Sequence, residues 1–170
     1  MKKELLEFFK KHEQIALEFN RRLKDLADYL RSRTEKMADG VEVPGCFTIR
    51  GKYWSSLNPK DETSTSIYHT VYYETDLAGV TVRIETWISV NGVWQIEVWL
   101  PKGGEFSKVK KWFEDNRIRF LHQDASTLIY AKFEDSVAED EVRKKLQELL
   151  NAINVRAKSR AAVADEIALK

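Results

Sequence analysis

Two neighbouring segments, 80–88 and 94–100, carry an apolar or β-branched residue at every second position, and this alternation constrains the fold more than any other feature of the sequence. A period of two is that of a β-strand, whose successive side chains point to opposite faces of a sheet. Two such segments joined by a short loop predict an antiparallel hairpin with one buried face. The residues expected on that face are Val80, Val82, Ile84, Thr86, Ile88, Trp94, Ile96, Val98 and Leu100.

The same alternation predicts the turn of this hairpin. A two-residue loop at Asn91-Gly92 would pair Ile88 with Gln95 and bring core residues opposite outer ones. A three-residue loop in which Gly92 is left-handed pairs Ile88 with Trp94 instead, and every core residue then faces another. We therefore predict the bulged hairpin.

A stripe of apolar residues runs from residue 2 to residue 37 with helical spacing and without Pro or Gly. It predicts one long helix, or two in line, that ends near Asp39-Gly40. At ~1.5 Å per residue this helix would be roughly 50 Å long, which exceeds what a small sheet covers. We expect it to break or to extend towards a second chain. Its stripe comprises Leu5, Phe8 or Phe9, His12, Ile15 or Ala16, Phe19, Leu23, Leu26 and Leu30.

The remaining segments complete an α+β pattern. Further strands are expected at 47–53, 67–73, 118–120 and 128–133, a short helix at 106–116, and a turn at 122–126. Ser136 and Glu139 form a capping box that opens a helix to Ile153, and the tail 155–170 has helical propensity but a thin apolar stripe. We expect one α+β domain over 1–170, with an antiparallel sheet of five to six strands, a long N-terminal helix, a mid-chain helix and one or two C-terminal helices.

Composition narrows the classes of function. The chain has 28 basic and 27 acidic residues, and its net charge of +1 removes the global electrostatic argument for binding nucleic acid or anionic membranes. Cys46 is the single cysteine, which fits a reducing, cytoplasmic location. We find neither a signal peptide nor a membrane span nor a cofactor motif, and we expect no membrane partner and no cofactor.

The outer face of the predicted sheet carries two neighbouring carboxylates. The bulged register sets Glu85 opposite Glu97 and Arg83 opposite Trp99. Like charges in direct opposition destabilise a sheet, so this pair indicates a divalent metal, a shared proton or a basic partner. Solvated, splayed carboxylates with Arg83 neutralising one of them are the structural alternative.

The strand before this hairpin adds aromatic residues to that face. A connection at 76–79 that pairs Tyr73 with Val80 would place Tyr68 beside Glu85 and Thr70 beside Arg83. Aromatic and arginine side chains are enriched at the centres of protein interfaces, although a helix covering the face would make them a second core layer. The candidate partner-binding residues are Tyr68, Tyr72, Arg83, Trp87 and Trp99.

One basic cluster stands out between residues 102 and 119. It would suit phosphate contacts, but acidic residues are interspersed and a solvated helix face has the same composition. The candidate nucleic-acid-binding residues are Lys108, Lys110, Lys111, Arg117 and Arg119. A metal-dependent nuclease would use Glu85 and Glu97, yet neither is followed two residues later by the lysine that such a site needs.

These patterns favour a non-enzymatic protein-interaction module, such as a small cytosolic inhibitor, adaptor or chaperone-like binder. Its binding surface would be the aromatic sheet face or a helix, and its partner another protein or a second copy bound through the long or C-terminal helices. The alternatives are a nucleic-acid-associated protein and a metal-dependent enzyme.

Overall fold

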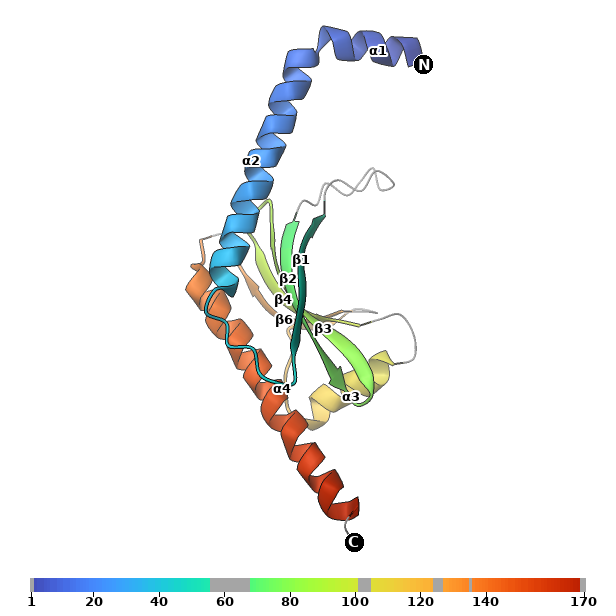
Figure 1. The fold of residues 1–170 in the computed structure, drawn as a ribbon, viewed down its shortest axis with the longest axis vertical. Coiled ribbons are helices and arrows are strands. Elements are labelled where there is room, and N and C mark those ends of the chain that lie inside the picture. Colours follow the sequence, from blue (N-terminus) through green and yellow to red (C-terminus); the bar gives the residue numbers. More distant parts are fainter. Residues whose placement is uncertain (1, 56–67, 101–104, 124–126, 135, 169–170) are drawn as a thin grey trace.

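The computed structural model describes residues 2–55, 68–100, 105–123, 127–134 and 136–168. It has the expected α+β class, with four helices and an antiparallel sheet (Figure 1). The helices are α1 (Lys2–Lys11), α2 (Glu13–Ala38), α3 (Phe106–Asp115) and α4 (Glu139–Ala168). The strands are β1 (Thr48–Ser55), β2 (Tyr68–Leu77), β3 (Val80–Ser89), β4 (Trp94–Trp99), β5 (His122–Gln123) and β6 (Thr127–Phe133).

The sheet has the strand order β1-β2-β3-β4-β6-β5, and all neighbouring strands are antiparallel. Strands β2, β3, β4 and β6 form its centre, β1 pairs with β2 at one edge, and the two-residue β5 pairs with β6 at the other. Residue 67, expected in the second strand, lies outside the described residues.

The predicted hairpin register is confirmed. Ile88 pairs with Trp94, Glu85 with Glu97 and, further along, Arg83 with Trp99. Gly92 has a φ of 72°, and its amide donates to the carbonyl of Ser89 at 2.9 Å. The left-handed glycine therefore provides the extra residue that aligns the two core faces.

The register between β2 and β3 differs from the prediction. The connection is the two-residue turn Ala78-Gly79, with φ of 55° and 78°, and Leu77 pairs with Val80. Tyr72, rather than Tyr68, therefore faces Glu85. The predicted register was wrong by an even number of residues, and an even slip keeps the same faces buried, so the apolar pattern did not reveal it.

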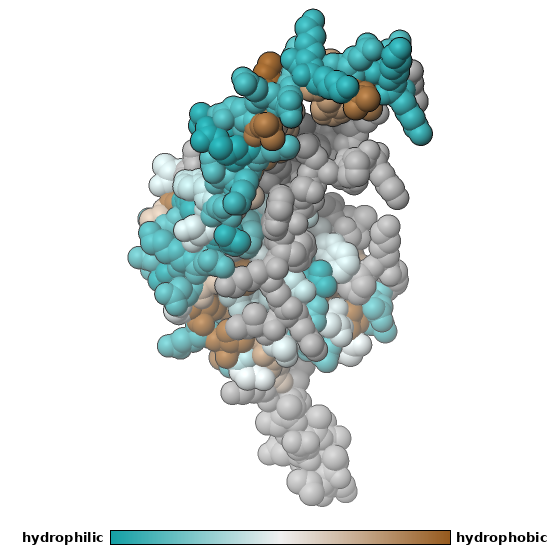
Figure 2. Space-filling model, turned by 45° about the horizontal axis from the view of Figure 1, so that its top comes forward, coloured by the Kyte–Doolittle hydropathy of each residue, from teal (hydrophilic) through white to brown (hydrophobic). Residues whose placement is uncertain are grey.

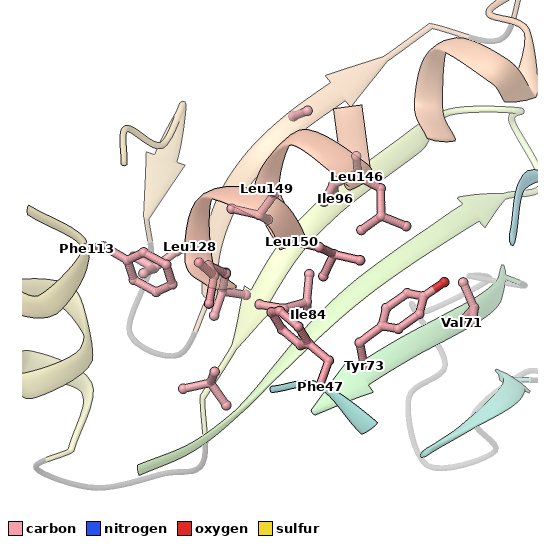
Figure 3. Close-up of a cluster of buried hydrophobic side chains, with 14 of the residues drawn as sticks. Phe47, Val71, Tyr73, Ile84, Ile96, Phe113, Leu128, Leu146, Leu149 and Leu150 are labelled. Atoms are coloured by element: carbon pink, nitrogen blue, oxygen red, sulfur yellow. The ribbon is translucent and has the colours of Figure 1, made fainter. Parts of the chain in front are cut away.

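Helices α2 and α4 cover one face of the sheet. Figure 3 shows Leu146, Leu149 and Leu150 of α4 clustered with Ile84 and Ile96 of the sheet, and all five side chains are fully buried. Arg143 of α4 donates to the carbonyls of Met37 and Lys36 at 3.0 and 2.6 Å. These carbonyls end α2, where intrahelical partners run out, so α4 both packs against and caps α2.

The C-terminal half contains three further corrections. The segment 118–120 is not a strand, because left-handed Arg117 (φ 57°) turns the chain back after α3 and Ile118 donates to the carbonyl of Phe113 at 3.0 Å. His122, expected in a turn, lies in β5. Glu139, expected at the third helical position, is the first residue of α4, which continues as a single helix to Ala168.

The N-terminal helices project beyond the sheet, as their length predicted. Figure 1 shows the upper part of α2 rising past the strands and α1 bending away from it. The bend lies at His12, with φ −118° and ψ 19°. The expected helix thus both breaks and overhangs, and we call residues 2–23 the helical arm.

Candidate functional site

Arg83 is the centre of the outer sheet face. Its guanidinium carbon lies 4.3 Å from the ring centroid of Tyr72 and 5.2 Å from that of Trp99. Its nitrogens donate to Glu74 at 3.3 Å and to Glu85 at 3.5 Å. Cation–π contacts with two rings and ion pairs with two carboxylates hold this arginine in place on the sheet.

The two opposed carboxylates have partners within the chain. Glu85 is 6% exposed and is paired with Arg83, while Glu97 accepts a hydrogen bond from the side-chain amide of Gln95. Arg83 thus neutralises Glu85, as in the structural alternative, but Glu85 is buried and not solvated as that alternative expected. Within the described part of the chain, no three His, Cys, Asp or Glu side chains group together to hold a metal ion. A metal at Glu85 and Glu97 stays a prediction.

The predicted partner-binding residues fall into two groups. Tyr72, Arg83 and Trp99 form the stack described above, and Tyr68 packs against Trp87 with ring centroids 6.1 Å apart. Only Trp99 reaches 36% exposure, and the other four side chains are half-buried. The contacts therefore bind these side chains largely to one another.

The predicted nucleic-acid-binding residues lie on α3 and the turn after it. Lys110 and Lys111 pair with acidic residues one helical turn away, Glu114 at 3.6 Å and Asp115 at 2.9 Å. Lys108, Arg117 and Arg119 are exposed, and the two arginines line a hollow of about 680 Å³. Nucleic-acid binding by this cluster stays a prediction, and residue 102 lies outside the described residues.

A nearly buried ion pair, which sequence analysis missed, joins α2 to the start of α4. Arg33 donates to Glu139 at 2.6 Å and to the carbonyl of Val137 at 3.1 Å, and both charged side chains are less than 15% exposed. Burial raises the pKa of the Glu139 carboxyl, but hydrogen bonds from Arg33, its own backbone and Lys36 outweigh burial and lower that pKa to about 2. No local motif links two charges so distant in sequence.

The helical arm carries most of the exposed large apolar side chains among the described residues. Figure 2 shows brown, apolar patches on it between hydrophilic residues, and α1 contains no buried residue. Seven of its large apolar side chains are each more than half exposed, and monomeric proteins rarely leave so many on one segment. They are Leu5 56%, Leu6 56%, Phe8 57%, Phe9 51%, Ile15 68%, Leu17 61% and Phe19 56%.

Part of this apolar surface continues a stripe that is buried lower on α2. The stripe residues alternate at spacings of four and three, which is the heptad pattern of helices that pack along their length. Its lower members pack on the body, where Leu30 is 1% exposed, and Met37, seven residues after the end of the stripe, is 0% exposed. The stripe consists of Leu5, Phe9, His12, Ala16, Phe19, Leu23, Leu26 and Leu30.

Among the helices in the described ranges, none has the length and apolar content to cross a bilayer. No protein-family model, curated protein or solved structure matches this chain.

Proposed function

We propose that this protein is a non-enzymatic association module that binds another protein through its helical arm. The observation that carries the proposal is the exposure of seven large apolar side chains on one projecting segment. Covering apolar surface is favourable by roughly 25 cal/mol per Å², so each of these side chains gains from contact with a partner. An amphipathic helix packed into an apolar groove or against another helix is a common mode of protein recognition.

The arm fits this role better than the aromatic sheet face. On the sheet, Arg83 already stacks between Tyr72 and Trp99 and is paired with two carboxylates. A partner docking there would have to compete with these contacts or would add little area. The apolar side chains of the arm retain most of their contact area for a partner. Cys46 as the single cysteine fits a reducing compartment such as the cytoplasm.

Photo-crosslinking in the producing cells tests the proposal. A benzophenone amino acid is placed at Phe19 on the stripe or, as a matched control, at exposed Gln14 on the opposite side of the same helix. Illumination should give a discrete protein adduct from position 19 and much less from position 14. Equal adducts at both positions, or none from position 19, would overturn the proposal.

A further inference from the structure

We infer that the protein bound by the arm is a second copy of this chain, packed antiparallel so that the two exposed stripes cover each other. This inference rests on the proposed function and names its partner. It is carried by three observations: the stripe keeps its frame through the bend, its upper part is self-complementary, and its area approaches that of a stable interface.

The stripe remains in heptad frame across the bend at His12. Leu5 and Phe9 precede the bend, Ala16 and Phe19 follow it, and the spacings of four and three continue without interruption. His12 also keeps the helical hydrogen bonds on both sides of the bend. Its amide donates to the carbonyl of Phe8 at 3.0 Å, and its carbonyl accepts from the amide of Ala16 at 2.9 Å. Residues 2–38 contain no Pro or Gly. The sequence is thus compatible with a straight helix, which pairing would favour.

The upper part of the stripe is complementary to its own reverse. It runs from Leu5 to Leu23, which is half-buried at the edge of its own core, and a two-fold axis at its midpoint, residue 14, pairs position i with position 28 − i. Leu5 of one copy then meets Leu23 of the other, and Phe9 meets Phe19. At the centre His12 meets Ala16, a large side chain against a small one.

The orientation follows from the same register. A parallel pair would stack each residue on its own copy, including His12 on His12, and would crowd both bodies at one end. In the antiparallel pair the bodies lie at opposite ends, and each α1 reaches the base of the other arm. The buried lower half of the stripe therefore stays on its own body.

The available area approaches that of a specific interface. Six large apolar side chains lie on the stripe or its flanks once Leu17, which is off the stripe, is left out. A fully covered aromatic side chain buries ~150–250 Å², so six side chains that are about half exposed present at most on the order of 600 Å². Each partner in a stable complex contributes ~800 Å². The stripe and its flanks thus provide most of the surface that one copy needs.

Sedimentation equilibrium of the full chain tests the pairing. The molecular mass measured for the wild type should be twice the mass of one chain, which is 19.8 kDa. Phe19→Glu should weaken the dimer by about tenfold or more, because it places a charge on the apolar stripe opposite Phe9 of the other copy. Leu17→Glu is the matched control, since Leu17 is equally apolar and exposed but lies off the stripe, and it should leave the dimer unchanged. Circular dichroism checks that both variants are folded.

Single-cysteine crosslinking tests the orientation in a Cys46→Ser background. Ile15 flanks the stripe next to the proposed axis, so Ile15→Cys should form a disulfide-linked dimer on mild oxidation. The two Phe19 positions would be roughly 15 Å apart along the helices, so Phe19→Cys should not crosslink. A disulfide at position 19 without one at position 15 would overturn the antiparallel arrangement.

The outcomes separate this inference from the proposed function. A wild-type chain that stays monomeric at every concentration overturns the second copy as partner. If the crosslinker at position 19 then captures a different protein, the proposed function stands and only the inference fails. If it captures nothing, because a segment of the same chain covers the stripe or because the arm stays free, both fail.

Discussion

The two halves of the α2 stripe share one helix and one spacing but differ in environment. In the lower half, Leu30 is fully buried against the sheet and α4, as is Met37 beyond the end of the stripe. In the upper half, Phe19 is more than half exposed although it occupies the equivalent place in the pattern. The comparison shows that the spacing of apolar residues determines which side of a helix gains from burial. The rest of the fold determines how much of that side is buried.

The largest effect that tests this comparison is expected at Leu30. Leu30→Glu places a charge in the core and should destabilise the chain by about 4 kcal/mol or more, or prevent folding. Thermal unfolding followed by circular dichroism measures the change. A folded variant with a wild-type melting temperature would show that the lower half of α2 is not packed as described.

A smaller effect is expected where the packed half of α2 meets α4. Arg33→Met removes the partner of the nearly buried Glu139 carboxylate and should cost about 2–3 kcal/mol, since Lys36 compensates only in part. Urea denaturation at neutral pH measures this loss. Arg31→Met, which removes an exposed ion pair with Asp28 on α2, is the control and should change stability by less than about 0.5 kcal/mol.

The same ion pair predicts a pH dependence. The pKa of Glu139 is lowered from 4.5 to about 2 in the folded chain, so its contribution to stability is fully present above pH 4.5 and is lost as the pH falls towards 2. The stability difference between wild type and Arg33→Met should therefore shrink over that interval. A difference that stays constant from pH 5 to pH 2 would show that the Glu139 pKa is not lowered.

Within the sheet, the hairpin turn should show a moderate effect. Gly92→Val forces a β-branched residue into the left-handed region and should cost about 1–2 kcal/mol. Gly45→Val is the matched control, because no atom lies within 4 Å of the added Cβ and its φ is not left-handed. Equal melting temperatures for the two variants would contradict the bulged turn.

The smallest effect is expected on the arm. Leu17→Glu should change the free energy of unfolding by less than about 0.5 kcal/mol, because the side chain is 61% exposed and lies off the stripe. Thermal unfolding alongside Leu30→Glu measures the contrast. A loss comparable to that of Leu30→Glu would remove the distinction between the two halves of the N-terminal helices.

Alternation and spacing predicted much of the fold. The core faces of β3 and β4, their register and the left-handed Gly92 all followed from where apolar residues had to meet. An error of one residue would have exposed a whole face, so this register was strongly specified. The overhang of the N-terminal helix followed in the same way from its length.

Other features depended on contacts between segments that no local sequence pattern predicts. The even slip between β2 and β3 left every core face intact, so only the Ala78-Gly79 turn decided that Tyr72 and Glu74 would flank Arg83 and Glu85. The pairing of Arg33 with Glu139 required α2 and α4 to cross first. The sequence by itself determined which faces must be buried, because hydrophobic burial depends on residue type and spacing. Which half of the α2 stripe found its cover within the chain was decided only by the tertiary structure, because α4 and the sheet reach the lower half of that helix.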